Sequence, residues 1–300
     1  MNAFLFSHIA DIDGITPIIL SKLAFKNVTY KLLDNPIDSE FLTVVNNTDF
    51  SNYDYIFMTD LCISEDALSK LDSNFLKKFK IFDHHIGNVN MNKYDFITII
   101  DSKECGTSLY YNYLCSNFNN DYLSKDITKH IVEHVRRCDT WDFSLGYDST
   151  LVDIFNVLGR DYYIDYLYNM ILNSTEFKID DKLKFLFEVE EKRKNEYIKE
   201  KEKSMIKCNI NNYKVGVVFA EEYRSLLGNT LSKNHEELDF IIIININRSV
   251  SYRTVKDINL SDFASIYGGK GHPKAAGSPL PDNLKENIIN LIFKEATYEK

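Results

Sequence analysis

Short apolar runs alternate with stretches of helical periodicity over the first 120 residues of the chain. The runs occupy residues 3–7, 28–33, 55–59, 80–82 and 96–100, and the helical stretches lie near residues 14–26, 64–78 and 106–118. This alternation is typical of βα units on a parallel sheet. Such sheets bind ligands at the carboxyl ends of their strands, and polar residues follow every run except the second at once. We therefore expect a site at that edge.

A highly charged helical stretch, residues 180–207, follows a further helical region at residues 121–172. A helix that is polar on all sides most often bridges domains, and a chain of 300 residues exceeds the usual size of one core. We predict an α/β fold with a parallel-sheet domain (residues 1–178), a helical linker (179–208) and a smaller α/β domain (209–300). The alternative is an interaction arm or coiled-coil seam, but sustained heptads are absent.

The pattern of the second domain is also mixed. We expect strands at residues 213–219, 240–246 and 250–255, helices at 222–235 and 260–266, the segment GGKGHPKAAG at 268–277, and an amphipathic terminal helix.

Composition narrows the classes of partner. Lys and Arg number 35 against 44 Asp and Glu, a formal charge of −9, which argues against a broad basic face for long duplex nucleic acid. Five cysteines without a CxxC pair favour a reducing compartment. The amino terminus does not resemble a signal peptide, and the longest apolar run, residues 240–244, is far too short for a membrane span. We expect a cytoplasmic protein.

Acidic and histidine side chains gather at the predicted strand ends. The first run is followed by His8, Asp11 and Asp13, the third by Asp60, the fourth by Asp83, His84 and His85, and Asp139 lies in a later helical region. Each aspartate alone is explained equally well as a helix cap or a solvated turn. Together they form a set of the right size for two divalent metal ions that share a carboxylate.

Mixed imidazole and carboxylate ligands favour Mn²⁺ over Fe²⁺, Co²⁺, Zn²⁺ or Mg²⁺, since structural zinc would be expected to recruit thiolates. Two ions ~3.5 to 4 Å apart can activate a water molecule and stabilise phosphoryl displacement. The set therefore favours hydrolysis of a phosphate ester or anhydride.

A glycine-rich segment in the second domain complements this set. Its glycines leave backbone amides free to hold an anion, and Lys270, His272 and Lys274 add positive charge. Arg253, in an earlier predicted strand, could form a bidentate pair with phosphate. The alternatives are an ordinary turn for the segment and a surface charge on an edge strand for Arg253.

These motifs, in this order, resemble those of the DHH phosphoesterase superfamily. SHIADIDG, Asp60, DHH at residues 83–85 and Asp139 match its four motifs, and residues 250–277 resemble the DHHA1 domain of its exonuclease and phosphodiesterase branch. The opening LFSHIADIDGITPIILSKLAF is similar to oligoribonucleases of the nanoRNase B type.

The resemblance implies a role for each site residue. His8, Asp11 and Asp60 would hold one metal ion, and Asp13, Asp60, His84 and Asp139 the other. The catalytic pair would be His85, at the scissile phosphate or the leaving group, and Asp83, which supports the histidines. Arg253, His272 and the glycines Gly268, Gly269 and Gly271 would bind substrate.

We therefore expect an exoribonuclease that degrades very short single-stranded RNA to mononucleotides with a hydroxide activated by two metal ions. The alternatives are a phosphatase or phosphodiesterase for a small nucleotide, such as 3′-phosphoadenosine 5′-phosphate or a cyclic nucleotide, and an inactive nucleotide-binding protein. A homodimer is one assembly we consider. Lys270 interrupts the three consecutive glycines of many relatives. Pyrophosphate is a poor candidate because the superfamily's pyrophosphatases carry a different second domain.

Two further features favour structural explanations. His130 and His134 share a helix face but have no evident third ligand, so we interpret them as surface or packing residues. Thr107 and Ser108 begin a predicted helix, where they could donate to a substrate phosphate or simply cap the helix.

Overall fold

Five short strands form a parallel sheet in the order β2-β1-β3-β4-β5. They are β1 (Asn2–His8), β2 (Asn27–Leu33), β3 (Tyr55–Thr59), β4 (Phe79–Asp83) and β5 (Ile97–Ile99). The computed structural model describes all residues except 100–102, 141, 143, 146–147 and 294–300. The predicted fifth strand therefore reaches residue 100 outside the described residues, as do parts of the helical region near residue 143.

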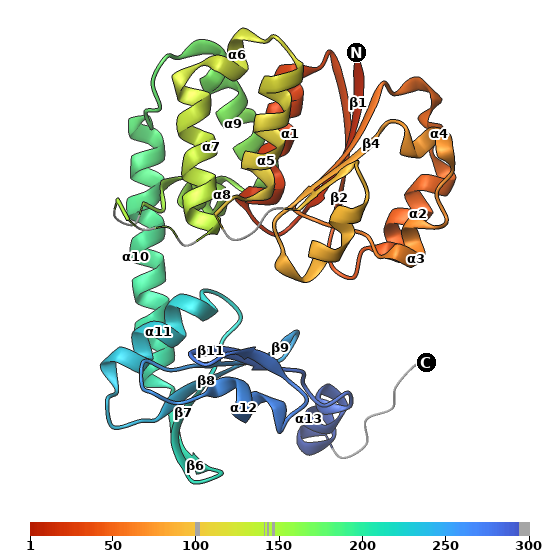
Figure 1. The fold of residues 1–300 in the computed structure, drawn as a ribbon. Coiled ribbons are helices and arrows are strands. Elements are labelled where there is room, and N and C mark those ends of the chain that lie inside the picture. The colour runs from red at the N-terminus through yellow and green to blue at the C-terminus, as the bar shows by residue number, and fades with distance from the viewer. Residues whose placement is uncertain (100–102, 141, 143, 146–147, 294–300) are drawn as a thin grey trace. The chain divides into compact units, whose positions relative to one another are not determined.

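Helices cover both faces of this sheet (Figure 1). One face packs against α1 (Ile12–Ala24), α5 (Gly106–Asn117), α6 (Asp121–Ser124), α7 (Asp126–Asp139), α8 (Thr150–Leu158) and α9 (Arg160–Asn173). The other packs against α2 (Asp38–Asn47), α3 (Glu65–Leu68) and α4 (Ser73–Leu76). Because both faces are buried, β1, β3 and β4 are nearly continuous apolar runs, whereas the edge strand β2 is largely accessible.

The strand register determines where the polar strand ends lie. Ser7 pairs with Thr59 across β1 and β3, and Thr59 pairs with Phe82 across β3 and β4. The next residues, His8, Asp60 and Asp83, therefore lie side by side at the carboxyl edge of the sheet.

One local prediction in this unit is wrong, and one helix was missed. The single helix expected at residues 64–78 is divided into α3 and α4, because the Asp72 side chain accepts from the amides of Asn74 and Phe75 and begins a new helix. Helix α2, with one buried residue, Phe41, was not predicted.

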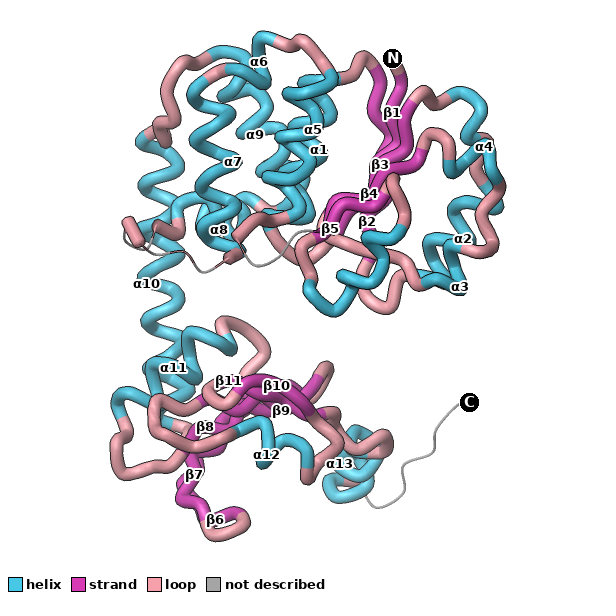
Figure 2. Tube along the Cα trace, in the orientation of Figure 1, coloured by secondary structure: helices cyan, strands magenta, loops and turns pink. Residues whose placement is uncertain are grey.

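The second sheet has six strands in the order β10-β11-β9-β8-β7-β6 (Figure 2). They are β6 (Ile206–Ile210), β7 (Tyr213–Phe219), β8 (Phe240–Asn245), β9 (Ser249–Arg253), β10 (Lys270–His272) and β11 (Ala275–Ser278). Only β7 and β8 pair in parallel among these described strands. Helix α11 (Arg224–Asn234) covers one face, α12 (Leu260–Ser265) covers the other, and α13 (Leu284–Ile292) follows β11.

The chain divides into two compact units, Met1–Phe187 and Glu188–Lys300, with the boundary inside α10 (Asp181–Lys203). The charged stretch is thus a helix, but it ends at Lys203, and Ile206–Ile210 form strand β6 instead of its last turn. Asn211 and Asn212 both have positive φ, 48° and 70°, which is the geometry of a tight hairpin turn. That turn pairs β6 with β7 and was missed in the sequence.

The thiols and the helix lengths give two further observations. All five cysteines are free in the structure. Among the described helices, none combines the length and the apolar character needed to cross a membrane.

Candidate functional site

Asp60 lies at the centre of a cluster at the carboxyl edge of the first sheet. Its backbone is left-handed, with φ of 56°, a conformation that Asp adopts more readily than most residues. Its two carboxylate oxygens meet different histidines: Oδ2 lies 3.2 Å from Nδ1 of His8, and Oδ1 lies 3.4 Å from Nε2 of His84. The carboxylate therefore joins the two halves of the cluster.

The first half consists of His8, Asp11 and Asp60. Asp11 caps α1 by accepting from the Gly14 amide at 3.0 Å, and its Oδ2 lies 3.4 Å from Nδ1 of His8. One ligand atom from each of the three residues lies within 4.8 Å of the others. This half could hold one cation.

The second half consists of Asp13, His84 and Asp139, whose ligand atoms meet the same limit of 4.8 Å. His84 Nε2 lies 3.2 Å from Asp139 Oδ2 and 3.9 Å from Asp13 Oδ2. Helix α1 supplies Asp13, the loop after β4 supplies His84 and the end of α7 supplies Asp139. Residues that are far apart in sequence therefore converge on a second possible cation position.

The start of α5 holds Asp13 in place. The amides of Gly106 and Thr107 donate to its two carboxylate oxygens, each at 2.8 Å. A Cβ at Gly106 would lie 2.7 Å from the Asp60 nitrogen, so only glycine allows α5 to approach Asp60 this closely. Sequence reasoning missed these amides, because the contact depends on how α5 packs against α1.

Asp83 organises the pair of histidines that follows it. Its Oδ1 lies 2.7 Å from Nδ1 of His85, and its Oδ2 accepts from Nδ2 of Asn88 at 2.8 Å. Asp83 is fully buried, whereas 56% of the His85 side chain is exposed. The ring of His85 is thus oriented through Nδ1 and keeps Nε2 free for a ligand. Asn88, within the 3-10 helix η2 (Ile86–Lys93), was not singled out in the sequence.

In the metal-free cluster, two carboxyl groups have pKa values above their usual range. Burial and the neighbouring carboxylates of Asp60 and Asp139 raise the pKa of Asp13 to about 8. Burial, and secondarily Asp60 and Asp11, raise the pKa of Asp139 to about 6 against the opposing effect of His84. A bound cation would stabilise the ionised form of these carboxylates, because a nearby positive charge lowers the pKa of an acid.

The pKa values of two histidines in the cluster are raised as well. Hydrogen bonds to Asp11 and Asp60 raise the pKa of His8 to about 10. For His84, burial alone would lower the pKa, but the hydrogen bond to Asp60 and the charges of Asp139 and Asp13 raise it to about 9. In the metal-free protein, protonated imidazoles therefore supply the positive charge that metal ions would supply to the carboxylates.

One oxygen tests whether the cluster suits a cation. Asp139 Oδ2 is buried and, among the described side chains, is the buried nitrogen or oxygen atom without a hydrogen-bond partner. Its neighbour His84 Nε2, at 3.2 Å, lacks hydrogen-bond geometry. An unpaired buried oxygen is costly, and a cation would satisfy it. The donor set of imidazoles and carboxylates fits divalent ions.

The cluster thus contains all eight of the site residues expected in the first domain: His8, Asp11, Asp13, Asp60, Asp83, His84, His85 and Asp139. Thr107 and Ser108 instead bond to protein groups, Thr107 Oγ1 to the Asp13 carbonyl and Ser108 Oγ to Glu104. His134 donates through Nε2 to the Asp148 carbonyl, and the ring of His130 lies beside Phe177.

The remaining site residues belong to the second unit. Arg253 lies at the end of β9, and its guanidinium donates to the carbonyls of Tyr252 and Ala276 and to Ser225 Oγ. Burial, and then the charge of Arg224, lower the pKa of Arg253. No described carboxylate forms an ion pair with it, so its charge and that of Arg224 are not neutralised by a described acidic side chain. Arg224, at the start of α11, was missed because the helix position alone carries no such signal.

The glycine-rich segment forms two strands instead of a loop before a helix. Strands β10 and β11 pair antiparallel, with Gly271 opposite Ala276. A Cβ on Gly269 would lie 2.1 Å from the Gly277 carbonyl, and one on Gly271 would lie 2.5 Å from Ala276 Cα. Close strand packing therefore explains both glycines. Their role in substrate binding, with Gly268 and the exposed His272, stays a prediction.

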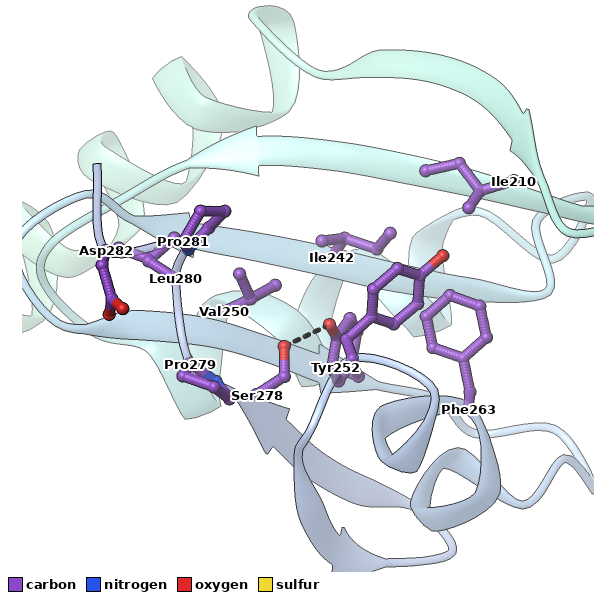
Figure 3. A pocket seen from close by; sticks show the side chains of 11 residues that line it. Ile210, Ile242, Val250, Tyr252, Phe263, Ser278, Pro279, Leu280, Pro281 and Asp282 are labelled. Carbon is purple, nitrogen blue, oxygen red and sulfur yellow. Dashed lines mark hydrogen bonds between the residues drawn. The ribbon is translucent and has the colours of Figure 1, made fainter. Parts of the chain in front are cut away.

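The second unit also contains an apolar pocket of 530 Å³ on the face that α12 covers (Figure 3). Tyr252 and Phe263 line it, and the Tyr252 hydroxyl hydrogen bonds to Ser278 Oγ at 2.6 Å. Its lining includes no cation. Because alternate residues of a strand face opposite sides, Arg253 points away from it, toward α11.

Comparisons with known proteins agree with the motifs. The chain is 31% identical over 307 residues to oligoribonuclease NrnB of Bacillus subtilis (strain 168), covering 97% of this chain and 76% of the relative. The solved structure of PggH, a pGpG-specific phosphodiesterase from Vibrio cholerae, has a TM-score of 0.53 at 12% identity and covers 97% of both chains. An uncharacterized Helicobacter pylori G27 protein has a TM-score of 0.47 at 18% identity over 98% of this chain and 100% of its own.

No protein-family profile matches the chain. The likeness to PggH shows a shared fold, and the relationship to the Bacillus protein extends over nearly the whole sequence. The chain therefore belongs to the family of oligoribonuclease NrnB, a branch of the DHH phosphoesterases, and is a phosphodiester hydrolase.

Proposed function

We propose that this protein is an exoribonuclease that uses two divalent metal ions, most favourably Mn²⁺, to hydrolyse very short oligoribonucleotides to mononucleotides. The observation that carries the proposal is the double contact of Asp60, whose oxygens meet His8 and His84 separately. The relative's name, oligoribonuclease, supports the substrate class. The net charge of −9 suits a substrate of a few nucleotides better than a long strand.

In this proposal His8, Asp11 and Asp60 hold one ion, and Asp13, Asp60, His84 and Asp139 hold the other. Two bound divalent ions would activate a water molecule and offset the charge that develops on the phosphoryl oxygens. The amides of Gly106 and Thr107 hold the Asp13 carboxyl group in position for this purpose, and a bound cation would favour its ionised form.

His85 supplies the acid. The hydrogen bond to Asp83 raises the pKa of His85, so the imidazole is more readily protonated near neutral pH. With Nδ1 engaged by Asp83, the proton on Nε2 is directed to the exposed side, where it can be donated to a phosphoryl or leaving-group oxygen. Asp83 keeps the ring in that orientation.

The second unit binds substrate phosphate in this proposal. Arg253 and Arg224 supply positive charge without a described acidic partner, and His272, with the glycines at 268, 269 and 271, adds to this surface. We assign the catalytic domain to residues 1–178, the linker to 179–208 and the substrate-binding domain to 209–300, and we propose that the protein works in the cytoplasm, with a homodimer as one assembly to test.

A substrate comparison tests the proposal. Purified protein with Mn²⁺ is incubated with labelled RNA of two to five nucleotides, with 3′-phosphoadenosine 5′-phosphate and with cyclic dinucleotides, and products are separated by chromatography. We expect mononucleotides from the RNA at the highest kcat/KM. Turnover of the small nucleotides alone would replace the proposal with the phosphatase or cyclic phosphodiesterase alternative, and no turnover of any substrate would favour a nucleotide-binding protein.

A further inference from the structure

A second pocket, of 540 Å³, opens beside the metal-ligand cluster within the first unit. Three loops line it: the chain between β2 and α2, the chain between β3 and α3, and the 3-10 helix η2 after β4. Each loop follows a strand at the carboxyl edge of the parallel sheet, where such folds bind ligands. The volume falls within the ~300–1,000 Å³ of small-molecule sites.

Each of these loops is attached to the cluster. Asn35 follows Asp34, whose Oδ1 lies 4.0 Å from Nε2 of His8, and Cys62 comes two residues after Asp60. Asn88 lines the pocket and also donates to Asp83. A group bound in the pocket therefore lies next to the position that a scissile phosphate would take at the cluster.

The lining is unsuitable for phosphate. Among the described residues that line it, the one with a charged side chain is Asp38, whose carboxylate accepts from the backbone amide and the hydroxyl of Ser64. None of these described residues is a lysine, arginine or histidine. A phosphate placed there would lose hydration without a compensating cation, so the lining favours an uncharged part of a nucleotide over its phosphate.

The polar lining suits a ligand that both donates and accepts hydrogen bonds. Asn35 and Asn90 line the pocket, and within the described part of the chain no hydrogen bond is made by either side-chain amide. An amide offers two donors and one acceptor, the complement of a nucleobase edge. Ile63 and Met91 add apolar surface for the flat faces of a base.

We propose that this pocket binds the nucleobase and ribose of one nucleoside next to the scissile phosphate. The proposal rests on the proposed function, because it assigns a subsite to the same substrate. It places recognition of the neutral part of the substrate in the first unit, while phosphate recognition depends on cations.

Gly87 provides the means to test it. It lines the pocket, and a Cβ there would meet no atom within 4 Å. Gly87→Leu should therefore fill the pocket without displacing the fold, and Gly87→Ala is the matched control that leaves most of the space open. A second variant, Asn35→Ala with Asn90→Ala, removes the unpaired amides and leaves the pocket open.

Binding is measured without turnover. The probe is the adenosine dinucleoside methylphosphonate, whose linkage is uncharged, and its affinity for each full-length protein is measured by calorimetry with EDTA present. We expect Gly87→Leu to weaken binding at least tenfold, the double alanine variant threefold or more, and Gly87→Ala less than twofold. Melting temperatures of all proteins confirm folding.

Equal affinities for all variants, or no saturable binding by the wild-type protein, would overturn the assignment. If Gly87→Leu does not fold, the double alanine variant decides in the same way. Failure of the proposed function is a separate result: it would appear as no hydrolysis of RNA two- to five-mers by the wild-type protein, whatever the binding experiment gives.

Discussion

His8 Nδ1 lies 3.2 Å from Oδ2 of Asp60, a carboxylate carried on a left-handed backbone at the end of β3. Strained backbone is found at functional sites, where the surrounding structure holds it. Asp60→Asn keeps the shape and suits the same backbone, because Asn also adopts the left-handed region readily.

We expect Asp60→Asn to lower kcat/KM for a dinucleotide by more than about 10²-fold, the upper range for loss of an outer partner of a metal ligand, with an unchanged circular dichroism spectrum. His84→Ala should have a similar effect. Steady-state kinetics with Mn²⁺ checks both, and a wild-type rate in either variant would contradict the shared-carboxylate arrangement.

Metal should stabilise the folded protein through Asp139. A ligand that binds only the native state adds about 2.7 kcal/mol at 100 times its Kd, which raises Tm by about 5–10 °C. Titration of Mn²⁺ in a thermal-shift assay measures the change. Asp139→Asn, which removes charge from the unpaired buried oxygen, should reduce the shift by at least half. Asp142→Asn, at a partly buried residue bonded to Arg136, is the control and should retain it.

Metal binding should release protons and strengthen as pH rises. In the metal-free protein the pKa of His8 is about 10 and that of His84 about 9, so both are protonated at pH 7, and a cation must displace those protons. Affinity should increase from pH 6 to above about pH 10 and level off only once both histidines are neutral. Calorimetry in two buffers of different ionisation enthalpy counts the protons, and a pH-independent affinity would refute the interpretation.

The sequence predicted the residues of the site better than the contacts that hold them in place. His8, Asp60 and Asp83 follow apolar strands, and a parallel register with one polar edge is enough to bring them together. The amides that hold Asp13 come from α5, and the position of Asp139 depends on where α7 ends. Those contacts arise from helix packing, which the sequence pattern does not specify.

Side-chain and turn interactions that compete with the apolar pattern explain the errors in the predicted helices and strands. Asp72 offers its carboxylate to backbone amides and divides a helix that the apolar spacing favoured. The Asn211–Asn212 turn makes strand β6 from a segment whose charge resembled the preceding helix. In both places one or two side chains outweigh the average pattern around them.

Arg253 should act on substrate binding. Arg253→Ala removes a cation with no described acidic partner, and the loss of a charged hydrogen bond to phosphate, about 1.5–3 kcal/mol, should raise KM about 10- to 100-fold with little change in kcat. Arg224→Ala and His272→Ala should raise KM less. Arg248→Ala, at an exposed arginine in the turn between β8 and β9, is the charge-matched control, and an equal effect there would show that only net charge matters.

Asp83 and Asn88 should set the pH dependence through His85. The hydrogen bond to Asp83 raises the pKa of His85, and hydrogen bonds from His85 and Asn88 outweigh burial to hold the pKa of Asp83 below its usual value. His85 donates a proton in the proposed reaction, so activity falls as pH rises through its pKa. Asp83→Asn removes the negative charge and should shift this alkaline limb of the kcat profile to lower pH.

Asn88→Ala should shift the limb in the same direction by a smaller amount and lower kcat about 10-fold, since it acts through Asp83. Asn88→Asp places a second carboxylate beside Asp83 Oδ2, where Nδ2 now donates at 2.8 Å, and repulsion should make it at least as damaging as alanine. A merely structural role for Asn88 would lower Tm and leave the limb in place. Because the alkaline limb reports the proton on His85 itself, its position separates the two explanations even when both variants lose activity.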